Sequence, residues 1–467
     1  MKKIKQNAYS ILEVLIALAL ITVCLASGAI LIFQGQSFSI DTKSNEQAIY
    51  LAQNNLENAK KAARLDFTGL NSSSATVGDF LNEIIVEAID QYQKKVTSRV
   101  TWTTDPLRPQ KIELAMIVTD WPNAVPPPDP TDTGGEGTSG DWCNPRTLGS
   151  VDLGPGNSAT DLDVIDKIIY MSASASSSAK PDFFIINATD GSNPVLVSSL
   201  DTGPTLNALD VGGGYAYLAN NNVNSQLQIL NVNDITTPTL ISTLKLPGVS
   251  GTNAIGNSIF YGYDKIFIGT KKATGPEFHI IDVSNPLAPV ALGSKEINED
   301  VNSIYVKDNY VYIANNGDEE LKIYDISNPA NITQVGGYSA PGDSENGKAI
   351  WVDLNNLYFG RIVGGNHSDH HEYHILNITQ EATPINLGSK NFSYNINDLR
   401  ARDGLTFLAT SDTNSEFQVW DINNPNNITF CSSFNFPQEA TGIDYEDNLV
   451  YMSVRSNDAF RIITSSP

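Results

Sequence analysis

The sequence predicts an α+β amino-terminal module, made of a long membrane-spanning helix and a small β head, followed by an all-β, seven-bladed β-propeller. Three observations predict this organisation: an apolar run from Tyr9 to Phe33, a proline- and glycine-rich segment at residues 122–140, and a strand pattern that recurs every 43 to 52 residues after that segment. The chain has 467 residues, more than one hydrophobic core usually supports, so several domains are expected.

Charge and cysteine content exclude some classes of protein. The formal net charge is −23, which would repel phosphate backbones, so we expect no nucleic-acid partner. Three cysteines do not form a disulfide framework of the kind that stabilises small secreted domains. If the downstream part of the chain is exported, Cys143 and Cys431 could pair, but the sequence gives no distance between them.

The amino terminus has the pattern of a membrane anchor. A leader at residues 1–8 carries three lysines, and the apolar run at residues 9–33 exceeds the ~20 residues that a helix needs to cross a bilayer. The lysines hold the amino terminus in the cytoplasm. The sequence therefore predicts a single-pass precursor in the cytoplasmic membrane. Glu13 is unusual in this run, because an intramembrane carboxylate is costly and normally has a partner.

These residues resemble the class III signal of type IV pilins and type II secretion pseudopilins. In that pattern Ala8, where the family usually has glycine, precedes the cleavage point, Tyr9 begins the mature chain and Glu13 is its fifth residue. The resemblance implies cleavage and methylation by a prepilin peptidase. It also implies that Glu13 neutralises the free amino terminus of a neighbouring pilin subunit during filament assembly. The alternative is an uncleaved anchor whose acid stays near the lipid headgroups.

The pattern after the apolar run predicts the rest of a pilin-like domain at residues 9–121. Apolar residues at three- and four-residue steps predict that one helix continues to about Leu65. The segment DFLNEIIVEAIDQYQ, residues 79–93, is a second helical candidate, and residues 94–104 and 111–121 read as two strands. A helix with a small strand-bearing head resembles a minor pilin.

The segment at residues 122–140 is a linker by composition. Its prolines favour extended polyproline geometry, and its later glycines and serines favour flexibility. It separates the pilin-like domain from residues 141–467, which are periodic throughout.

Seven related strings mark the repeats: FFIIN, LQILN, FHIID, LKIYD, YHILN, FQVWD and FRIIT. Most have a strand before them and a proline turn with a further strand after them, so each unit contains four strands. Four-stranded units of this length are typical of a β-propeller. The seventh unit ends after its third strand, and residues 146–154 match the missing outer strand. We therefore expect the two ends of the domain to pair and close the ring.

The strings LKIYDISNP, FHIIDVSNP and FQVWDINNP resemble the LVIVD family. The resemblance implies a surface-exposed propeller of ill-defined activity, and it does not imply an enzyme. Independently of the resemblance, the aspartate or asparagine that ends each third strand is predicted to bond the backbone of the following turn. These residues are Asn187, Asn231, Asp282, Asp325, Asn377 and Asp421.

A histidine-rich loop at residues 366–374 is the one candidate metal site. His367, Asp369, His370 and His371 occupy a hairpin in which imidazole and carboxylate could bind a divalent metal such as zinc. His374 belongs to the following strand and is expected to be packed or solvated there. The competing interpretation of the hairpin is a solvated polar loop without preorganised ligands.

The resulting prediction is a minor pilin or pseudopilin of a type IV pilus-like filament, not an enzyme. Its propeller would be an adhesion or partner-recognition head at the filament tip, in an extracellular or periplasmic filament. The expected partners are the prepilin peptidase, other pilin subunits, the inner membrane before assembly, and an unidentified surface, protein or glycan ligand. One alternative is a membrane-anchored extracytoplasmic propeller enzyme with a metal site in loop 366–374. Another is a pseudopilin whose propeller contacts exported cargo.

Overall fold

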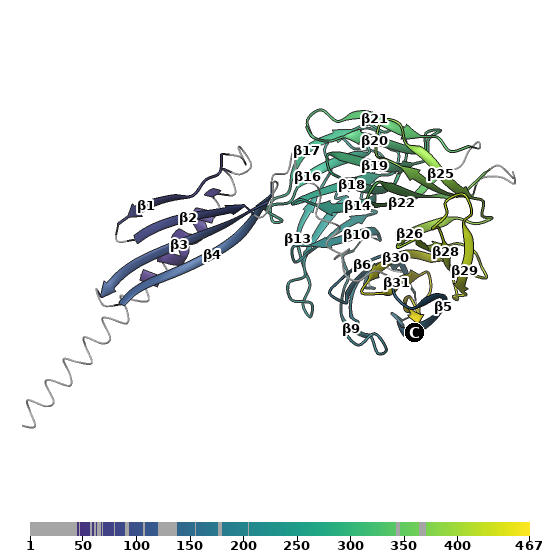
Figure 1. Cartoon of the computed structure of the whole chain (residues 1–467), viewed down its shortest axis with the longest axis horizontal. Helices are drawn as coiled ribbons and strands as arrows, with labels where there is room; N and C mark the ends of the chain where they lie inside the picture. The colour runs from purple at the N-terminus through teal and green to yellow at the C-terminus, as the bar shows by residue number, and fades with distance from the viewer. Residues whose placement is uncertain are drawn as a thin grey trace, which may run out of the picture. The chain divides into compact units, whose positions relative to one another are not determined.

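The computed structural model divides the chain into two compact units, residues 1–124 and 125–467. The residues that it describes are 44–45, 47–56, 58–59, 62, 67, 69–78, 80–88, 93–105, 108–119, 138–154, 156–175, 180–203, 205–341, 346–363 and 370–467. The two units are described separately below, and both are drawn in Figure 1.

The amino-terminal unit is a short helix packed on an antiparallel sheet. Helical residues lie between 44 and 62, and the sheet has the order β1-β2-β3-β4. The helix buries Ala48 and Ala52 in a cluster with Val100 and Trp102 of the sheet. The strands are β1 (Ser73–Val77), β2 (Phe80–Ala88), β3 (Gln93–Asp105) and β4 (Arg108–Thr119).

The predicted α+β fold class is wrong, because the described part of the chain is nearly all β. The second helix expected at residues 79–93 is in fact strand β2. Ile84, Ile85 and Val86 are consecutive β-branched residues, which favour extended backbone. β2 also pairs with β3 along its whole length, from Phe80 opposite Trp102 to Ala88 opposite Lys94. The two strands expected after it are confirmed as β3 and β4.

The predicted localisation is also corrected. The expected membrane-spanning helix at residues 9–33 lies outside the described residues. Across the part of the chain that is described, no helix combines the length and apolar character needed to cross a membrane. The helical residues between 44 and 62 bury alanines against the sheet and expose polar side chains, as an amphipathic helix on a protein core does. The single-pass membrane anchor is therefore withdrawn.

The second unit contains seven four-stranded antiparallel sheets. The first strand of each sheet contacts the first strand of the next, which places these seven inner strands around one axis. From the inner to the outer strand, the blades are β6 (Asn157–Ile165), β7 (Ile168–Ala175), β8 (Phe183–Asn187), β9 (Val195–Leu200); β10 (Leu206–Gly212), β11 (Tyr215–Asn220), β12 (Leu227–Asn231), β13 (Thr239–Leu244); β14 (Gly256–Gly262), β15 (Lys265–Thr270), β16 (Phe278–Asp282), β17 (Val290–Lys295); β18 (Val301–Lys307), β19 (Tyr310–Asn315), β20 (Leu321–Asp325), β21 (Thr333–Tyr338); β22 (Asn346–Asp353), β23 (Asn356–Ile362), β24 (Tyr373–Asn377), β25 (Ile385–Lys390); β26 (Ile396–Arg402), β27 (Leu405–Thr410), β28 (Phe417–Asp421), β29 (Thr429–Phe434); and β30 (Ala440–Glu446), β31 (Leu449–Val454), β32 (Phe460–Ser466) with β5 (Asp141–Val151).

The seventh blade closes the ring with strands from both ends of the unit. β5 pairs antiparallel with β32, from Val151 opposite Phe460 to Asp141 opposite Ser466. Figure 1 shows this dark blue strand beside the yellow strands of the carboxyl terminus. The inner strand β30 contacts β6 of the first blade, so the ring has no gap at this point. The prediction of a β-propeller is confirmed, and the closing strand begins at Asp141, earlier than the expected residues 146–154.

The turns after the third strands form as the sequence predicts. In six blades the last residue of the third strand accepts a hydrogen bond from the backbone N–H two residues later, at 2.8 to 3.0 Å. This is an Asx turn, which the short polar side chain stabilises. The acceptors are Asn187, Asn231, Asp282, Asp325, Asn377 and Asp421.

Candidate ligand site at the mouth of the central channel

The inner strands place one residue each at a common level around the propeller axis. Every inner strand ends in a two-residue hairpin, and the third residue from its end contacts the neighbouring inner strand at the same level. We call this set the axial ring. Its members are Asp163 on β6, Asp210 on β10, Phe260 on β14, Tyr305 on β18, Trp351 on β22, Arg400 on β26 and Asp444 on β30.

One half of the axial ring is aromatic. The ring centroids of Phe260 and Tyr305 are 5.3 Å apart, and those of Tyr305 and Trp351 are 5.5 Å apart. The guanidinium carbon of Arg400 lies 4.5 Å from the centroid of the Trp351 ring. At this distance a guanidinium is attracted to the face of an indole, so Arg400 ends the aromatic half with a fixed positive charge.

The other half of the axial ring is acidic and holds the blades together. Arg400 Nε lies 3.2 Å from Asp444 Oδ1. Each acid then accepts a backbone N–H from the next inner strand: Asp444 from Val164 at 3.0 Å, Asp163 from Val211 at 2.7 Å and Asp210 from Tyr261 at 2.7 Å. These carboxylates therefore lock neighbouring blades in register.

A second level of charged residues lies deeper on the same inner strands. Asp161 on β6 accepts the Leu209 N–H at 3.1 Å, and Asp398 on β26 accepts the Ile443 N–H at 3.0 Å. Burial raises the pKa of Asp161 to about 7, and the nearby charge of Asp398 raises it further. Burial also raises the pKa of Asp398, although Arg400 opposes this shift, and burial lowers the pKa of Lys348 on β22.

The raised pKa of Asp161 makes stability depend on pH. An unfolded aspartate ionises near pH 4, so between about pH 4 and 7 the folded chain binds a proton that the unfolded chain has lost. The free energy of unfolding is therefore expected to fall as pH rises through this range, by on the order of 2 kcal/mol. Urea unfolding at several pH values measures this fall.

The variant Asp161→Asn should flatten this dependence, because its amide keeps an acceptor for the backbone and does not ionise. The matched control is Asp201→Asn in the exposed loop after β9, where the side chain accepts only the Gly203 N–H at 3.0 Å. A profile for Asp161→Asn as steep as that of the parent chain would refute the assignment.

A small pocket opens beside the axial ring. Trp351 and Arg400 form one side of it, and Arg402 lies with its guanidinium carbon 5.7 Å from the Tyr445 ring centroid on the other. Trp351 is only 7% exposed, and Asp444 is 1% exposed. The full lining is Trp351, Arg400, Ala401, Arg402, Asp444 and Tyr445.

The residues predicted to act in processing and filament assembly, Ala8, Tyr9 and Glu13, lie outside the described residues. So do His367 and Asp369 of the predicted metal site, and that site stays a prediction.

The two described candidates for the metal site contact their own chain. His370 is buried and its carbonyl oxygen accepts a hydrogen bond from Asn391, while His371 Nδ1 lies 2.5 Å from Ser389 Oγ. Within the described ranges, no three histidine, cysteine or acidic side chains gather closely enough to hold a metal ion.

His374 is packed in the core, one of the two environments expected for it. Its Nε2 lies 2.8 Å from the His371 carbonyl oxygen, and its Nδ1 lies 3.3 Å from the Tyr338 hydroxyl. Burial lowers the pKa of His374 to about 3, with Arg361 adding to the shift, so the ring is neutral at physiological pH.

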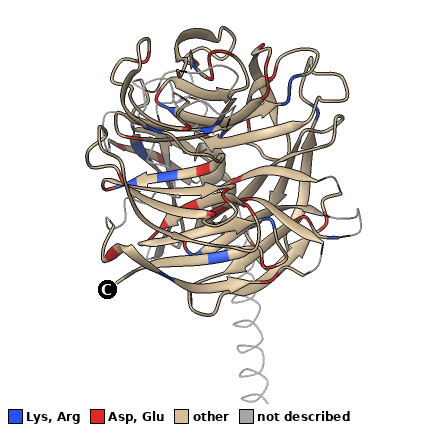
Figure 2. Ribbon diagram, turned by 90° about the vertical axis from the view of Figure 1, so that its right-hand side faces the viewer, with Lys and Arg blue, Asp and Glu red and all other residues tan. Residues whose placement is uncertain are grey.

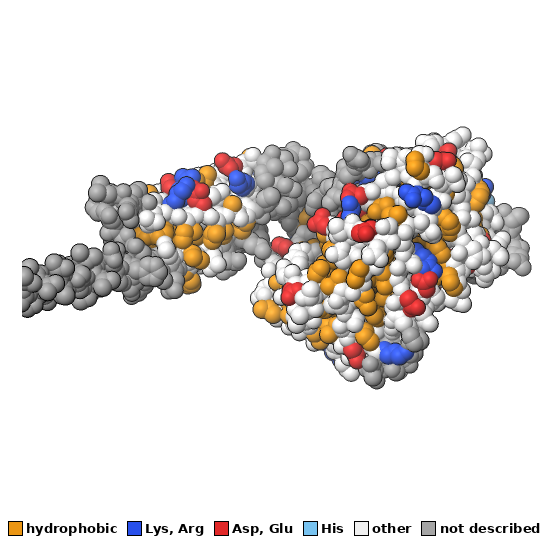
Figure 3. Space-filling view, turned by 90° about the horizontal axis from the view of Figure 1, so that it is seen from below, with side chains coloured by type: hydrophobic (Ala, Val, Ile, Leu, Met, Phe, Trp, Pro, Cys, Tyr) orange, Lys and Arg blue, Asp and Glu red, His pale blue; other side chains and the backbone are white. Residues whose placement is uncertain are grey.

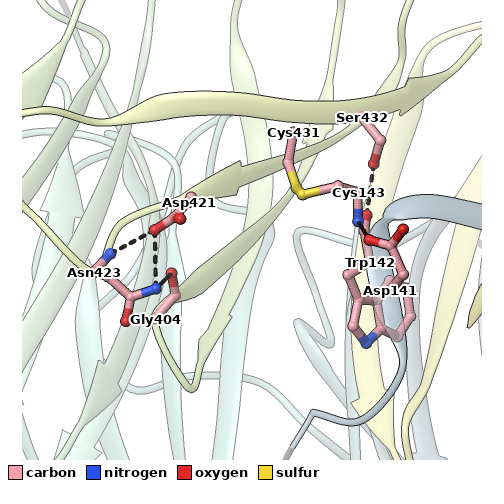
Figure 4. Close-up of a disulfide and its surroundings, with 8 residues drawn as sticks. All are labelled: Asp141, Trp142, Cys143, Gly404, Asp421, Asn423, Cys431 and Ser432. Atoms are coloured by element: carbon pink, nitrogen blue, oxygen red, sulfur yellow. Dashed lines mark hydrogen bonds between the residues drawn. A yellow bond between two sulfur atoms is a disulfide. The ribbon is translucent and has the colours of Figure 1, made fainter.

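Cys143 and Cys431 form a disulfide between the outer strands of the seventh and sixth blades (Figure 4). Their Cα atoms are 4.6 Å apart. Beside the bond, the Ser432 hydroxyl donates to the Trp142 carbonyl at 2.9 Å, and the Trp142 indole N–H donates to Asn448 at 3.0 Å. The closing strand is therefore fixed by a covalent bond and by side chains, in addition to its pairing with β32.

One set of structural residues was missed by the sequence analysis. In six blades the residue directly before the third strand accepts the backbone N–H of the residue 20 positions later, at 2.5 to 3.0 Å. The signal was visible as a carboxylate or amide at one fixed point of each repeat. These residues are Asp182, Gln226, Glu277, Glu320, Glu372 and Glu416.

Fold and site together define a seven-bladed β-propeller that is closed by a strand from its own amino-terminal end. The LVIVD repeat model matches residues 207–245, 273–295 and 299–340, which fall in the second, third and fourth blades. No curated protein matches the chain.

Solved structures share the propeller fold at low sequence identity. A chain in the crystal structure of the mitotic checkpoint complex is 13% identical with a TM-score of 0.54, and the match covers 69% of this chain and 95% of that one. A catalytically inactive virginiamycin B lyase from Staphylococcus aureus with quinupristin is 15% identical with a TM-score of 0.50, covering 68% and 98%. At these identities the similarity shows the fold alone.

Proposed function

We propose that this chain is a non-catalytic recognition protein whose propeller is a rigid head that binds a partner at the mouth of its central channel. The observation that carries this proposal is the axial ring. Its acids are held by the backbone of neighbouring blades, while its aromatic half and Arg400 border a pocket. A rigid site lined by aromatic groups with a few fixed polar groups is suited to selective binding.

The engagement of the buried acids favours binding over catalysis. A general acid or base must exchange its proton with a substrate, which requires an oxygen that the fold does not already occupy. Asp444 illustrates the difference. Its Oδ1 accepts the Tyr445 N–H at 2.8 Å and contacts Arg400, and its Oδ2 accepts the Val164 N–H.

The outer surface also suits contact with a partner. Charged residues of both signs are spread over the strands and loops of the propeller (Figure 2), without one large patch for a nucleic acid. Several outer strands begin with exposed apolar side chains, and apolar areas appear among the polar ones in Figure 3. Exposed apolar residues of this kind are a feature of contact surfaces. They include Val195, Leu240, Val290, Ile385 and Phe430.

A finer form of the proposal is that the chain is a minor subunit of a pilus-like filament, with the propeller as its adhesion head at the tip. This part rests on the sequence motif around Ala8, Tyr9 and Glu13. Its expected partners remain the prepilin peptidase, other pilin subunits, and a surface, protein or glycan bound by the propeller.

The proposal predicts that attachment depends on the propeller. Cells that make the full chain should adhere to a panel of surfaces, immobilised proteins and glycans, and cells that make a chain without residues 141–467 should lose most of this adhesion. The measurement is the number of adherent cells at equal levels of the two chains. A second variant, Arg402→Gln, tests the mouth of the channel without removing the fold.

Equal adhesion by both chains would reject the recognition role. The rival enzyme hypothesis makes a different prediction: the purified chain would contain stoichiometric divalent metal, and His370→Ala with His371→Ala would remove it. Finding that metal would favour the rival.

A further inference from the structure

The pocket beside the axial ring contains a buried donor without an acceptor. Trp351 is 7% exposed, and its Nε1 has no hydrogen-bond partner in the described structure. Most buried polar side-chain atoms in proteins are paired, and an unpaired buried donor costs roughly 1–3 kcal/mol. An acceptor on a bound molecule would remove this cost.

The other polar groups of the pocket favour an anionic acceptor. Arg400 and Arg402 contribute two guanidinium groups to the lining, against the single carboxylate of Asp444. Both oxygens of Asp444 accept hydrogen bonds from this chain's own groups. The pocket is therefore locally positive in a chain whose formal net charge is −23.

We propose that this pocket binds the carboxylate of an acidic saccharide. A carboxylate is planar and presents two oxygens, which match the donors of a guanidinium group, and the Trp351 N–H supplies a further donor. The inference rests on the proposed recognition function and names the chemistry of its ligand.

The aromatic half of the axial ring favours a sugar over an acidic peptide side chain as the source of the carboxylate. Phe260 and Tyr305 continue from Trp351 around the channel mouth, and both are partly exposed. Aromatic rings cover the C–H face of a pyranose well, because their faces are apolar while their edges lie beside polar groups. A flexible glutamate side chain has no comparable face.

The test uses the full chain labelled with ¹⁵N in its tryptophans, of which there are five. The indole N–H signal that disappears in Trp351→Phe is assigned to Trp351. During titration with D-glucuronate this signal should move and saturate, and D-glucose should leave it in place. Arg402→Gln should weaken binding of glucuronate about tenfold, which corresponds to about 1.4 kcal/mol.

Trp420→Phe is the matched control. It also removes a buried indole N–H, which donates to Gln418 at 2.9 Å, but it does not line the pocket. Glucuronate affinity should stay unchanged in this variant.

Two results would overturn the inference. One is an unmoved Trp351 signal in millimolar glucuronate. The other is a shift that N-acetylglutamate amide produces at the same concentration as glucuronate, which would assign the pocket to an acidic side chain. Failure here is distinct from failure of the proposed function, because adhesion through the propeller can be measured without glucuronate. Binding of glucuronate together with propeller-independent adhesion would reject only the proposed function.

Discussion

Replacing Cys143 and Cys431 together with serine is expected to lower the free energy of unfolding of the propeller by about 2–5 kcal/mol. The bond joins residues 288 positions apart, so in the unfolded chain it closes a loop of nearly the whole propeller. Its removal gives the unfolded chain more conformational freedom and leaves β5 held by β32 and side chains alone. Urea unfolding followed by tryptophan fluorescence measures the loss.

Cys24→Ser is the control for this experiment, because it removes the third cysteine and leaves the cross-link in place. The parent chain with a reducing agent should unfold like the double serine variant. Equal unfolding midpoints for the parent and the double variant, with and without reductant, would show that the cross-link does not stabilise the propeller.

The second large effect is expected from Glu320→Gln. Glu320 and Arg361 form a buried ion pair with 2.7 Å between Oε1 and Nη2, and the two side chains are 3% and 0% exposed. The amide keeps an acceptor for the Ala340 N–H, which Glu320 Oε2 now binds at 3.0 Å, but leaves the buried arginine without its counter-charge. Removing one partner of a buried pair typically costs 3–5 kcal/mol.

The chain provides a matched control in the sixth blade. Glu416 precedes its third strand as Glu320 does, and its Oε2 accepts the Phe436 N–H at 2.6 Å. Glu416→Gln should cost only about 1 kcal/mol, because the neutral amide preserves the hydrogen bond. Thermal unfolding of both variants decides the matter. Similar small losses would mean that the charge of Glu320 is not needed, while partial recovery in Glu320→Gln with Arg361→Met would support the buried pair.

The propeller was predictable because its signals are local and repeated. Each third strand is a short apolar string that ends in a turn-forming residue, and one such signal recurs seven times. Closure by the two ends of the domain followed from counting strands in the last unit. Its starting point at Asp141 did not, since Trp142 enters the structure through contacts with Phe407 and Tyr445, which are distant in sequence.

The amino-terminal unit was predicted less well, for a physical reason. The segment around Ile84 to Val86 combines helix-forming leucine, glutamate and alanine with β-branched residues, so its local preference is ambiguous. Pairing with β3 then decides the structure.

The axial ring and the pocket could not be predicted from local patterns. Tyr305, Trp351, Arg400 and Asp444 are separated by more than 40 positions each and become neighbours only when the blades assemble around one axis. Once the inner strands are aligned on their hairpins, however, the third residue from each strand end identifies the ring. The capping acids before the third strands could be found by the same alignment.

The position of the disulfide also bears on mechanical load. Ser139 and Thr138 bond Asn448 and Asp403, and the chain then enters β5, so a pull on the linker reaches this strand first. Without a covalent link, tension could peel β5 from β32 one hydrogen bond at a time and open the wheel. With Cys143 bonded to Cys431, the force passes into the sixth blade near the start of β5. A head built in this way can be dragged by its tether and keep its shape.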